Sequence, residues 1–435
     1  MGHSNVLDGV DPPAQLLSHT MSNTSSHADA VSVLICGGMQ HLARPLLWFL
    51  AEDKDATTTR RTGPQIKHVR MVDKFIVSQA GSSLWIDPRT LKTLQDPRFD
   101  YKQVNLMNRE AAQKVFRAPD GGGYDIVFDL TGEGAGLGTN LSSQMLYDRT
   151  TKLARQLAEI AAAEGVKAYL RDTGGYLTIK PDEAALKEDQ VAGRTVKSRK
   201  AFWWHEAERA VADVPGLNLV ITRSAGIWGP FQYVSPLMPR LYMGQVYEWH
   251  KEPMKLLGRA AADAEAGEPI GRIEYSGKDE DEIKRILSQA QDICPRDKTP
   301  RAPVFNVVDG DNTDQGKILE TVGKAFNIET GFVNTAITTW ARLNLSSVVD
   351  DVNAKHFDMV FDMLKHTHPP VTHETSPLTS FLDAEALANR ALALDGSKLR
   401  RTIGWAPTRH LSAEELLAIR AEFRQSGGAW PSFRE

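Results

Sequence analysis

Cysteine is almost absent from this chain, which has only Cys36 and Cys294 among its 435 residues. Their wide separation offers neither a disulfide framework nor a metal-ligand spacing, so we expect a reduced, intracellular protein without a metal site. Apolar runs long enough to cross a bilayer are missing, and so is the charged-then-apolar start of a signal peptide. These absences predict a cytoplasmic protein with no membrane partner.

A strong excess of one charge is also missing, because 51 Lys and Arg residues accompany 55 Asp and Glu residues. The resulting net charge of -4 provides no field for a nucleic-acid backbone, so the default partner is a small molecule. Hydrophobic residues make up 41% and charged residues 24% of the chain, which is ordinary for a globular protein. The length suffices for one large core or for two to three domains.

The order of elements along the chain indicates an α/β fold. Residues 1–29 are polar and aperiodic, and we interpret them as a disordered leader. Beyond them, apolar runs alternate with segments of helical periodicity. The predicted strands are 31–36, 68–73, 125–130, 166–170 and 217–222, and the clearest predicted helices are 146–164 and 196–212. This alternation predicts a doubly wound parallel sheet with right-handed crossovers.

A glycine turn follows the first predicted strand. Gly37 and Gly38 come directly after residues 31–36, and leucines at helical spacing follow them. In the Rossmann pattern G-x-x-G-x-x-G, Gly37 fits the first glycine, whereas Gln40 and Ala43 replace the second and third. Ala43 is a mild change, but the Gln40 side chain occupies space that phosphates would use.

Acidic and amide residues follow the next two strands. Asp73 ends the second predicted strand, where an acid hydrogen-bonds the ribose hydroxyls of NAD and disfavours a 2′-phosphate. Lys74 leaves NADP open. Asn105 lies where it can bond an adenine edge, and Thr131, just after the strand at 125–130, is expected to border the cofactor.

With these segments the chain, from residue 31 to 407, resembles the extended short-chain dehydrogenase/reductases, the NAD-dependent epimerase/dehydratase family. Further segments that resemble it are 223–230, similar to R-P-x-x-V-Y-G-P, together with 394–399 and 404–407. Residues 305–309 and 341–353 are similar to a fungal group of this family. The resemblance implies a Rossmann-type dinucleotide-binding domain at 30–240 and a smaller, mostly helical domain at 241–435 that mainly binds substrate. A strand near 304–308 is expected to return to the sheet.

The resemblance also implies a Tyr-x-x-x-Lys reaction centre, and the sequence departs from it. Lys200 fits the lysine, but Val196 stands at the tyrosine position of the helix predicted over 196–212. Asp172 or Thr173 falls at the family's Ser/Thr position, and Tyr176 matches a later loop tyrosine. We therefore expect the catalytic candidates to line one cleft; they are Asp172, Thr173, Tyr176 and Lys200.

Ordinary structural roles compete with these assignments. Asp172 as a structural acid is about as plausible as a catalytic one, and Tyr176 is more often a packing residue. Trp203 and Trp204 favour core positions, whereas His205 is predicted at a surface or interface. Gly132, Gly134, Gly136 and Gly138 form either a pliant loop or a simple turn. The residues expected to contact cofactor are Gly37, Gly38, Gln40, Asp73, Asn105, Thr131 and Lys200, and those expected to contact substrate are Trp228 and Tyr233.

Three functions remain open from the sequence. The first is an NAD(P)-dependent reductase, dehydrogenase or epimerase for a small organic substrate in secondary metabolism, with NAD favoured over NADP. The second is a redox-neutral isomerase, cyclase or lyase on the same fold, with the nucleotide structural or absent. The third is a non-catalytic nucleotide sensor. The resemblance further implies self-association, with a homodimer as the simplest form.

Overall fold

The computed structural model describes most of the chain, in several stretches. These are residues 30–52, 64–77, 85–133, 141–174, 176–177, 184–233, 237–256, 269–311, 313–333, 344–372, 375–381, 393–426 and 429–433. The predicted leader at 1–29 and the glycines 134, 136 and 138 lie outside the described residues.

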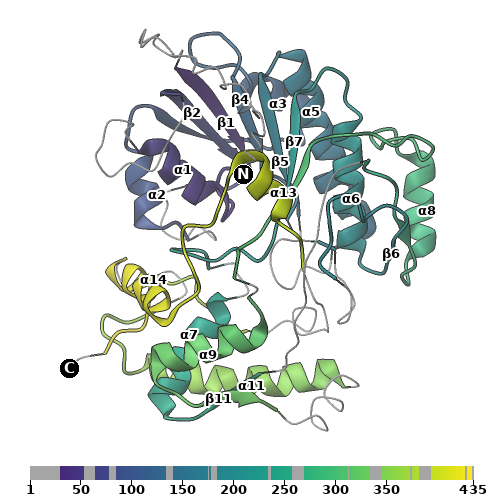
Figure 1. Ribbon diagram of the computed structural model, residues 1–435. Helices are drawn as coiled ribbons and strands as arrows, with labels where there is room; N and C mark the ends of the chain where they lie inside the picture. Colours follow the sequence, from purple (N-terminus) through teal and green to yellow (C-terminus); the bar gives the residue numbers. More distant parts are fainter. Residues whose placement is uncertain are drawn as a thin grey trace, which may run out of the picture.

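A seven-stranded parallel sheet forms the centre of the upper part in Figure 1, with strand order β10-β7-β5-β4-β1-β2-β3. Its strands are β1 (Val31–Cys36), β2 (Ile66–Asp73), β3 (Phe99–Gln103), β4 (Ile126–Asp129), β5 (Ala168–Asp172), β7 (Leu219–Ser224) and β10 (Val304–Val307). From β1 the chain winds outward first through β2 and β3, then in the other direction from β4. This order confirms the predicted doubly wound Rossmann-type fold and puts its switch point between β1 and β4.

Helices cover both faces of the sheet because side chains alternate along each strand. Leu34 and Cys36 of β1 belong to the apolar cluster shared with α3 (Arg109–Val115), α5 (Leu153–Ala163) and α6 (Arg199–Ala212). Val33 and Ile35 belong to the cluster on the opposite face, which includes residues of α1 (Ala43–Ala51). Helix α2 (Pro88–Thr93) packs beside α1.

Short elements connect the main ones. Helix α4 (Ser143–Leu146) and a π-helical segment, η1 (Tyr147–Lys152), run into α5 without a break, so the predicted helix 146–164 begins earlier than expected. Strand β6 (Thr195–Val196) pairs with β9 (Glu274–Tyr275), and α8 (Glu280–Gln289) follows. The predicted start of a helix at Val196 is therefore wrong, since this residue is in a strand and α6 begins at Arg199.

The C-terminal part is smaller and mostly helical, and it lies below the sheet in Figure 1. It contains α7 (Met238–His250), α9 (Gln315–Phe326), α11 (Leu345–Leu364) and α14 (Ala413–Gln425), with the strand pair β8 (Met254–Leu256) and β11 (Thr330–Phe332). Helix α13 (Ser397–Ile403) instead returns to the sheet and contacts β10.

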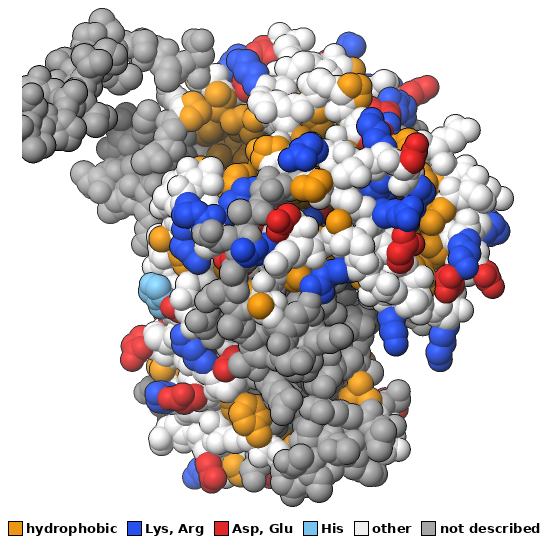
Figure 2. Space-filling view, turned by 45° about the vertical axis from the view of Figure 1, so that its right-hand side comes forward, with side chains coloured by type: hydrophobic (Ala, Val, Ile, Leu, Met, Phe, Trp, Pro, Cys, Tyr) orange, Lys and Arg blue, Asp and Glu red, His pale blue; other side chains and the backbone are white. Residues whose placement is uncertain are grey.

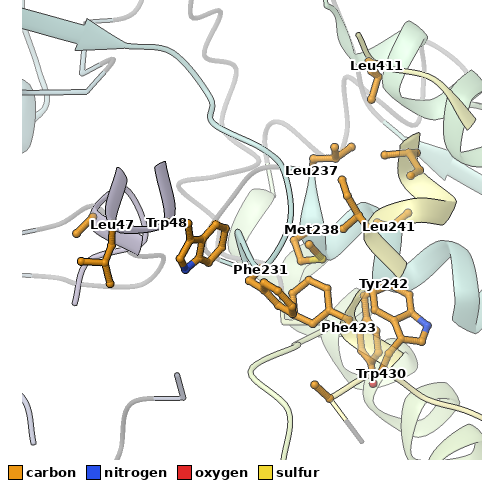
Figure 3. Packing of buried hydrophobic residues seen from close by; sticks show 14 of the residues in the cluster. Leu47, Trp48, Phe231, Leu237, Met238, Leu241, Tyr242, Leu411, Phe423 and Trp430 are labelled. Atoms are coloured by element: carbon orange, nitrogen blue, oxygen red, sulfur yellow. The ribbon is translucent and has the colours of Figure 1, made fainter. Parts of the chain in front are cut away.

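One apolar cluster joins the two parts of the molecule (Figure 3). The ring centroids of Trp48 in α1 and Phe231 are 5.9 Å apart, and those of Phe231 and Phe423 in α14 are 5.1 Å apart. Trp430 and Tyr242 of α7 extend the same cluster. The C-terminal part is thus held against the Rossmann part by shared core packing.

The surface carries both signs of charge. On the face drawn in Figure 2, Lys and Arg side chains lie among Asp and Glu side chains over the described residues. None of the described helices has the length and apolarity needed to span a membrane.

Candidate functional site

The turn after β1 is held tightly against the neighbouring strands. The backbone N–H groups of Gly37 and Gly38 both donate to the Val72 carbonyl of β2, at 2.9 Å each. Gly37 has φ +78°, and a Cβ there would lie 2.9 Å from the Leu130 carbonyl oxygen. Gly38 has no room for a Cβ either, because it would lie 2.7 Å from Cβ of Met71. Both glycines are required by the close approach of this turn to β2 and β4.

Helix α1 begins shortly after the glycine turn, without a side-chain cap at Leu42, and its first turn contains no acidic residue. Burial lowers the pKa of His41 to about 4, with further lowering by the charges of Arg44 and Lys200. The predicted contact residue Gln40 is half-buried in this turn. The Ala43 N–H donates to the Gln40 carbonyl at 3.0 Å and Pro45 has no N–H, so this turn offers an anionic group such as a pyrophosphate fewer donors than a regular helix N-terminus does.

Asp73 connects β2 to the glycine turn. Its Oδ2 accepts a hydrogen bond from the Met39 N–H at 2.9 Å, and its Oδ1 accepts one from the Lys74 N–H at 2.7 Å. Burial raises the pKa of Asp73, although these two backbone hydrogen bonds partly offset the effect. The carboxylate therefore lies beside the turn after β1.

Asn105 and Thr131 lie in different surroundings, one exposed and the other buried. Asn105 follows β3 and is exposed, and its Oδ1 accepts from the Met107 N–H at 3.1 Å. Thr131 follows β4 and is buried, and its hydroxyl donates to Asp129 at 2.7 Å and accepts from Arg171 at 3.1 Å. Asn105 is thus accessible to a ligand, whereas the Thr131 hydroxyl is engaged in an internal network.

Asp172 ends β5 beside the end of β7. Its Oδ1 accepts from the Ser224 hydroxyl at 2.5 Å and from the Thr222 hydroxyl at 2.8 Å. Burial raises the pKa of Asp172, and the hydrogen bonds from Ser224 and Thr222 partly offset this. A carboxyl with a raised pKa at the carboxyl end of a parallel sheet is a candidate acid or base.

Thr173 and Tyr176 contact a separate, buried polar network around Glu208 of α6. The Thr173 hydroxyl donates to Glu208 Oε1 at 2.8 Å, and Arg223 donates to both oxygens of Glu208 at 2.9 and 2.6 Å. The Tyr176 hydroxyl lies 3.2 Å from Nδ1 of His205. Thr173 also bonds the Thr222 carbonyl, at 3.2 Å, so Thr222 connects this network to Asp172.

His205 belongs to the same network, so its predicted surface or interface position is wrong. Its side chain is fully buried, with Nε2 located 2.7 Å from the Gly271 carbonyl oxygen. That carbonyl requires Nε2 to donate, which leaves Nδ1 to accept from the Tyr176 hydroxyl. Trp203 and Trp204 are buried, as predicted for core residues.

Lys200 lies in the first turn of α6, and Trp204 follows it by one helical turn on the same face. The positive charge of Lys200 contributes to the lowered pKa of His41 in the turn after β1. Trp204 covers the loop after β4: its Nε1 donates to the Glu133 carbonyl at 2.9 Å, and a Cβ on Gly132 would lie 2.5 Å from its ring. Trp204 therefore connects α6 to the loop after β4.

The predicted substrate residues lie on the segment after β7. Tyr233 accepts a hydrogen bond from Arg44 at 3.2 Å and packs edge-on against Trp85 at 5.8 Å. Trp228 is partly buried against the apolar cluster of Figure 3. Between them, Gln232 donates to the His41 carbonyl at 2.7 Å. This segment is thereby tied to the turn after β1.

Sequence reasoning missed three residues of this region: Ser224, Gln232 and Glu133. Ser224 lies two residues beyond the strand predicted at 217–222 and within the segment 223–230, which was the available signal. Gln232 and Glu133 lie in loops, where spacing carries little information about contacts. Within the described stretches, no group of three or more His, Cys, Asp or Glu side chains could hold a metal ion.

Comparisons with known proteins give a likeness of fold. No family model matches the sequence, and no curated protein matches it. A UDP-glucuronic acid 4-epimerase from Bacillus cereus, solved with UDP-glucuronic acid and NAD, is 15% identical, with a TM-score of 0.52 over 91% of this chain and 99% of that one. A dTDP-glucose 4,6-dehydratase from Bacillus anthracis, solved with NAD, is 12% identical, with a TM-score of 0.53 over 92% of this chain and 99% of that one. DesIV, a dTDP-glucose 4,6-dehydratase from Streptomyces venezuelae solved with NAD, is 14% identical, with a TM-score of 0.52 over 92% of this chain and 98% of that one.

Proposed function

We propose that this chain is an NAD-binding enzyme of the short-chain dehydrogenase/reductase type, acting on a small polar organic substrate in the cytoplasm. The observation that carries the proposal is the position of Asp73. Asp73 ends β2, next to β1, and its carboxylate accepts a hydrogen bond from the Met39 N–H of the glycine turn at 2.9 Å. In this fold an acid at that position binds the adenosine ribose hydroxyls.

The chain's own groups fit the adenosine and pyrophosphate portions of NAD. Asp73 would hold the ribose, exposed Asn105 would meet the adenine, and the uncapped N-terminus of α1 would face the phosphates. Gly37 and Gly38 keep the turn close to β2 and β4. When bound, the nicotinamide of NAD supplies a hydride acceptor or donor.

Because Val196 stands at the tyrosine position, other residues would carry out proton transfer. Asp172 is held by Ser224 and Thr222 with a raised pKa, so it retains a proton at higher pH than an exposed carboxyl. We assign it as the proton donor or acceptor for a substrate hydroxyl or carbonyl. Lys200, in the first turn of α6, would contribute positive charge that stabilises a developing oxyanion.

The substrate is proposed from the segment after β7 and from the structural neighbours. Trp228 and Tyr233 lie on a segment tied to the glycine turn through Gln232. The three neighbours named above include an epimerase for a UDP-sugar and dehydratases for a dTDP-sugar. We propose a polar substrate of comparable chemistry, such as a sugar or polyol derivative, with reduction, oxidation or epimerisation as the reaction and secondary metabolism as the setting.

A redox-neutral reaction is the second candidate, and Trp204 favours it. Its indole lies over Gly132 and bonds the Glu133 carbonyl, so a large side chain covers the loop after β4. Together with the absence of a tyrosine at Val196, this arrangement fits an isomerase, cyclase or lyase that uses Asp172 and Lys200 while NAD is structural.

The test begins with the nucleotide. The purified chain is denatured, released nucleotide is identified by mass spectrometry, and the emptied protein is titrated with NAD, NADH, NADP and NADPH. We expect NAD or NADH to be released or bound, and Asp73→Ala to weaken binding at least tenfold because two ribose hydrogen bonds are lost. Asp120→Ala, which removes a partly exposed carboxylate on a surface loop, is the matched control. Absence of binding to all four nucleotides would contradict the proposal.

A further inference from the structure

An ion pair bridges the two strand ends that flank β1. Lys74 directly follows β2 and Glu133 lies in the loop after β4, while β1 pairs with both of these strands. Lys74 Nζ is 2.6 Å from Glu133 Oε1. The pair therefore extends over the carboxyl end of β1, beside Asp73 and the glycine turn.

The backbone of Glu133 is fixed from two sides. Its N–H donates to the Thr150 hydroxyl of η1 at 3.2 Å, and its carbonyl accepts from Trp204 Nε1 at 2.9 Å. Neither bond involves the carboxylate, which also lies 3.6 Å from Nη1 of Arg149. The acid is thus positioned by the scaffold independently of Lys74, whose own side chain is half exposed.

We propose that Glu133 is a specificity-determining residue that selects NAD against NADP by occupying Lys74; this inference rests on the proposed NAD site. A ribose held by Asp73 would direct a 2′-phosphate toward Lys74, the neighbouring cation. Because Glu133 already neutralises that ammonium group, the phosphate would meet two carboxylates, Asp73 and Glu133, without an unpaired positive charge at Lys74. The ribose 2′-hydroxyl of NAD carries no charge, so the two carboxylates do not weaken its binding.

The experiment compares four proteins: the wild-type chain, Glu133→Gln, Lys74→Gln and the double variant. Dissociation constants for NAD and NADP are measured by calorimetry at low and at moderate ionic strength. Glu133→Gln removes a carboxylate and releases Lys74, so we expect NADP to bind roughly tenfold tighter, with a smaller gain at higher salt. The affinity for NAD should change by less than about threefold, since neutral hydroxyls gain little from the released charge.

The other variants separate the role of Lys74 from a general loss of negative charge. Lys74→Gln alone should leave the binding of NADP weak. The double variant should lose most of the gain in NADP affinity seen for Glu133→Gln. Arg149→Gln is the matched control, because Arg149 also contacts Glu133 but follows neither β2 nor β4. Backbone bonds of Glu133 persist in all of these variants, and circular dichroism verifies that each is folded.

The outcomes distinguish this inference from the proposed function. Should NAD bind while the preference between NAD and NADP stays within a factor of two in Glu133→Gln, the role of Glu133 is refuted and the NAD site stands. An equal gain in the double variant would refute the part assigned to Lys74. If no nucleotide binds to any of the four proteins, both the inference and the proposed function are overturned.

Discussion

Single buried groups set the electrostatics of this molecule. Asp172 is buried between two hydroxyl donors, and Glu208 is buried with Arg223 and Thr173. The two carboxyls respond differently: burial dominates at Asp172 and raises its pKa, whereas Arg223 offsets burial at Glu208 and the pKa of Glu208 is lowered. A buried acid without a cation in direct contact is the one suited to exchange protons near neutral pH.

Asp172→Asn should stabilise the fold at alkaline pH. A raised pKa means that the folded state disfavours the ionised carboxyl. The ionised group therefore lowers the free energy of unfolding at a pH above the folded-state pKa, and this loss disappears at a pH below the ordinary pKa of 3.8. The amide oxygen of Asn can still accept from Ser224 and Thr222. Urea unfolding at pH 8 and pH 4 should show a gain for the variant of about 1.4 kcal/mol for each unit by which the pKa is raised, present at pH 8 and fading at pH 4. A loss of stability at pH 8 would contradict this account.

His205 should make the fold sensitive to acid. Burial lowers its pKa from 6.5 to about 4, so the unfolded chain binds a proton at a pH where the folded chain does not. Stability should therefore fall as the pH drops from 6.5 to 4, by up to about 3 kcal/mol for this group. The slope of unfolding free energy against pH, measured in urea, should be shallower in His205→Gln. Identical slopes in the two proteins would show that another group is responsible.

At the scale of elements, the π-helical segment η1 determines where the β4 loop lies. The wider turn at Tyr147–Lys152 places two adjacent threonines against different partners. Thr150 accepts from the Glu133 N–H, and Thr151 donates to the Trp203 carbonyl of α6 at 2.7 Å. One irregular turn thus connects the loop that carries Glu133 to the helix that carries Lys200.

Thr150→Val should remove the hydrogen bond between η1 and the loop after β4 while keeping the side chain nearly the same shape. Valine has nearly the same volume but cannot accept from Glu133, so a partly buried N–H loses its partner at a cost of roughly 1 kcal/mol. Chemical denaturation should report that loss, and hydrogen exchange of the Glu133 amide should accelerate. Thr93→Val, at an exposed hydroxyl of α2 that bonds the Arg89 carbonyl, is the control and should change stability by less than about 0.5 kcal/mol. Equal effects of the two substitutions would argue against a special role for η1.

At the scale of the whole molecule, shared apolar packing makes the two parts one cooperative unit. The cluster of Figure 3 contains residues of α1, α7 and α14 together with Phe231, which adopts the uncommon positive φ of 56°. Phe423 is fully buried at its centre. Because the segment after β7 that carries the proposed substrate residues packs against this cluster, its position depends on the C-terminal part.

Phe423→Ala should weaken both parts together. Removing a fully buried phenylalanine leaves a cavity and costs about 3–5 kcal/mol. The midpoint of unfolding should shift by the same amount whether it is followed by far-ultraviolet circular dichroism or by tryptophan fluorescence, since the cluster is common to both parts. Phe361→Ala, at a side chain that is 57% exposed on α11, is the control with little expected effect. Separate transitions would show that the two parts unfold independently.

The sequence alone determined the class of fold and its most regular elements. Apolar runs at 31–36 and 125–130 specify buried strands, and glycines at 37 and 38 specify the turn between β1 and α1, because no side chain fits there. Asp73 could likewise be placed at the end of β2, since its place follows from the strand itself. Such features depend on local pattern, which one chain segment carries by itself.

Tertiary structure alone decided which polar side chains meet. Asp172 and Thr173 are adjacent in sequence, yet their side chains bond Ser224 on one side and Glu208 on the other, because neighbouring residues at a strand end diverge. His205 was misplaced because a helix position does not reveal that Tyr176 and Gly271 cover it. The pair of Lys74 and Glu133 joins residues 59 positions apart. It forms because β1 separates the ends of β2 and β4 by a distance that two long side chains can span.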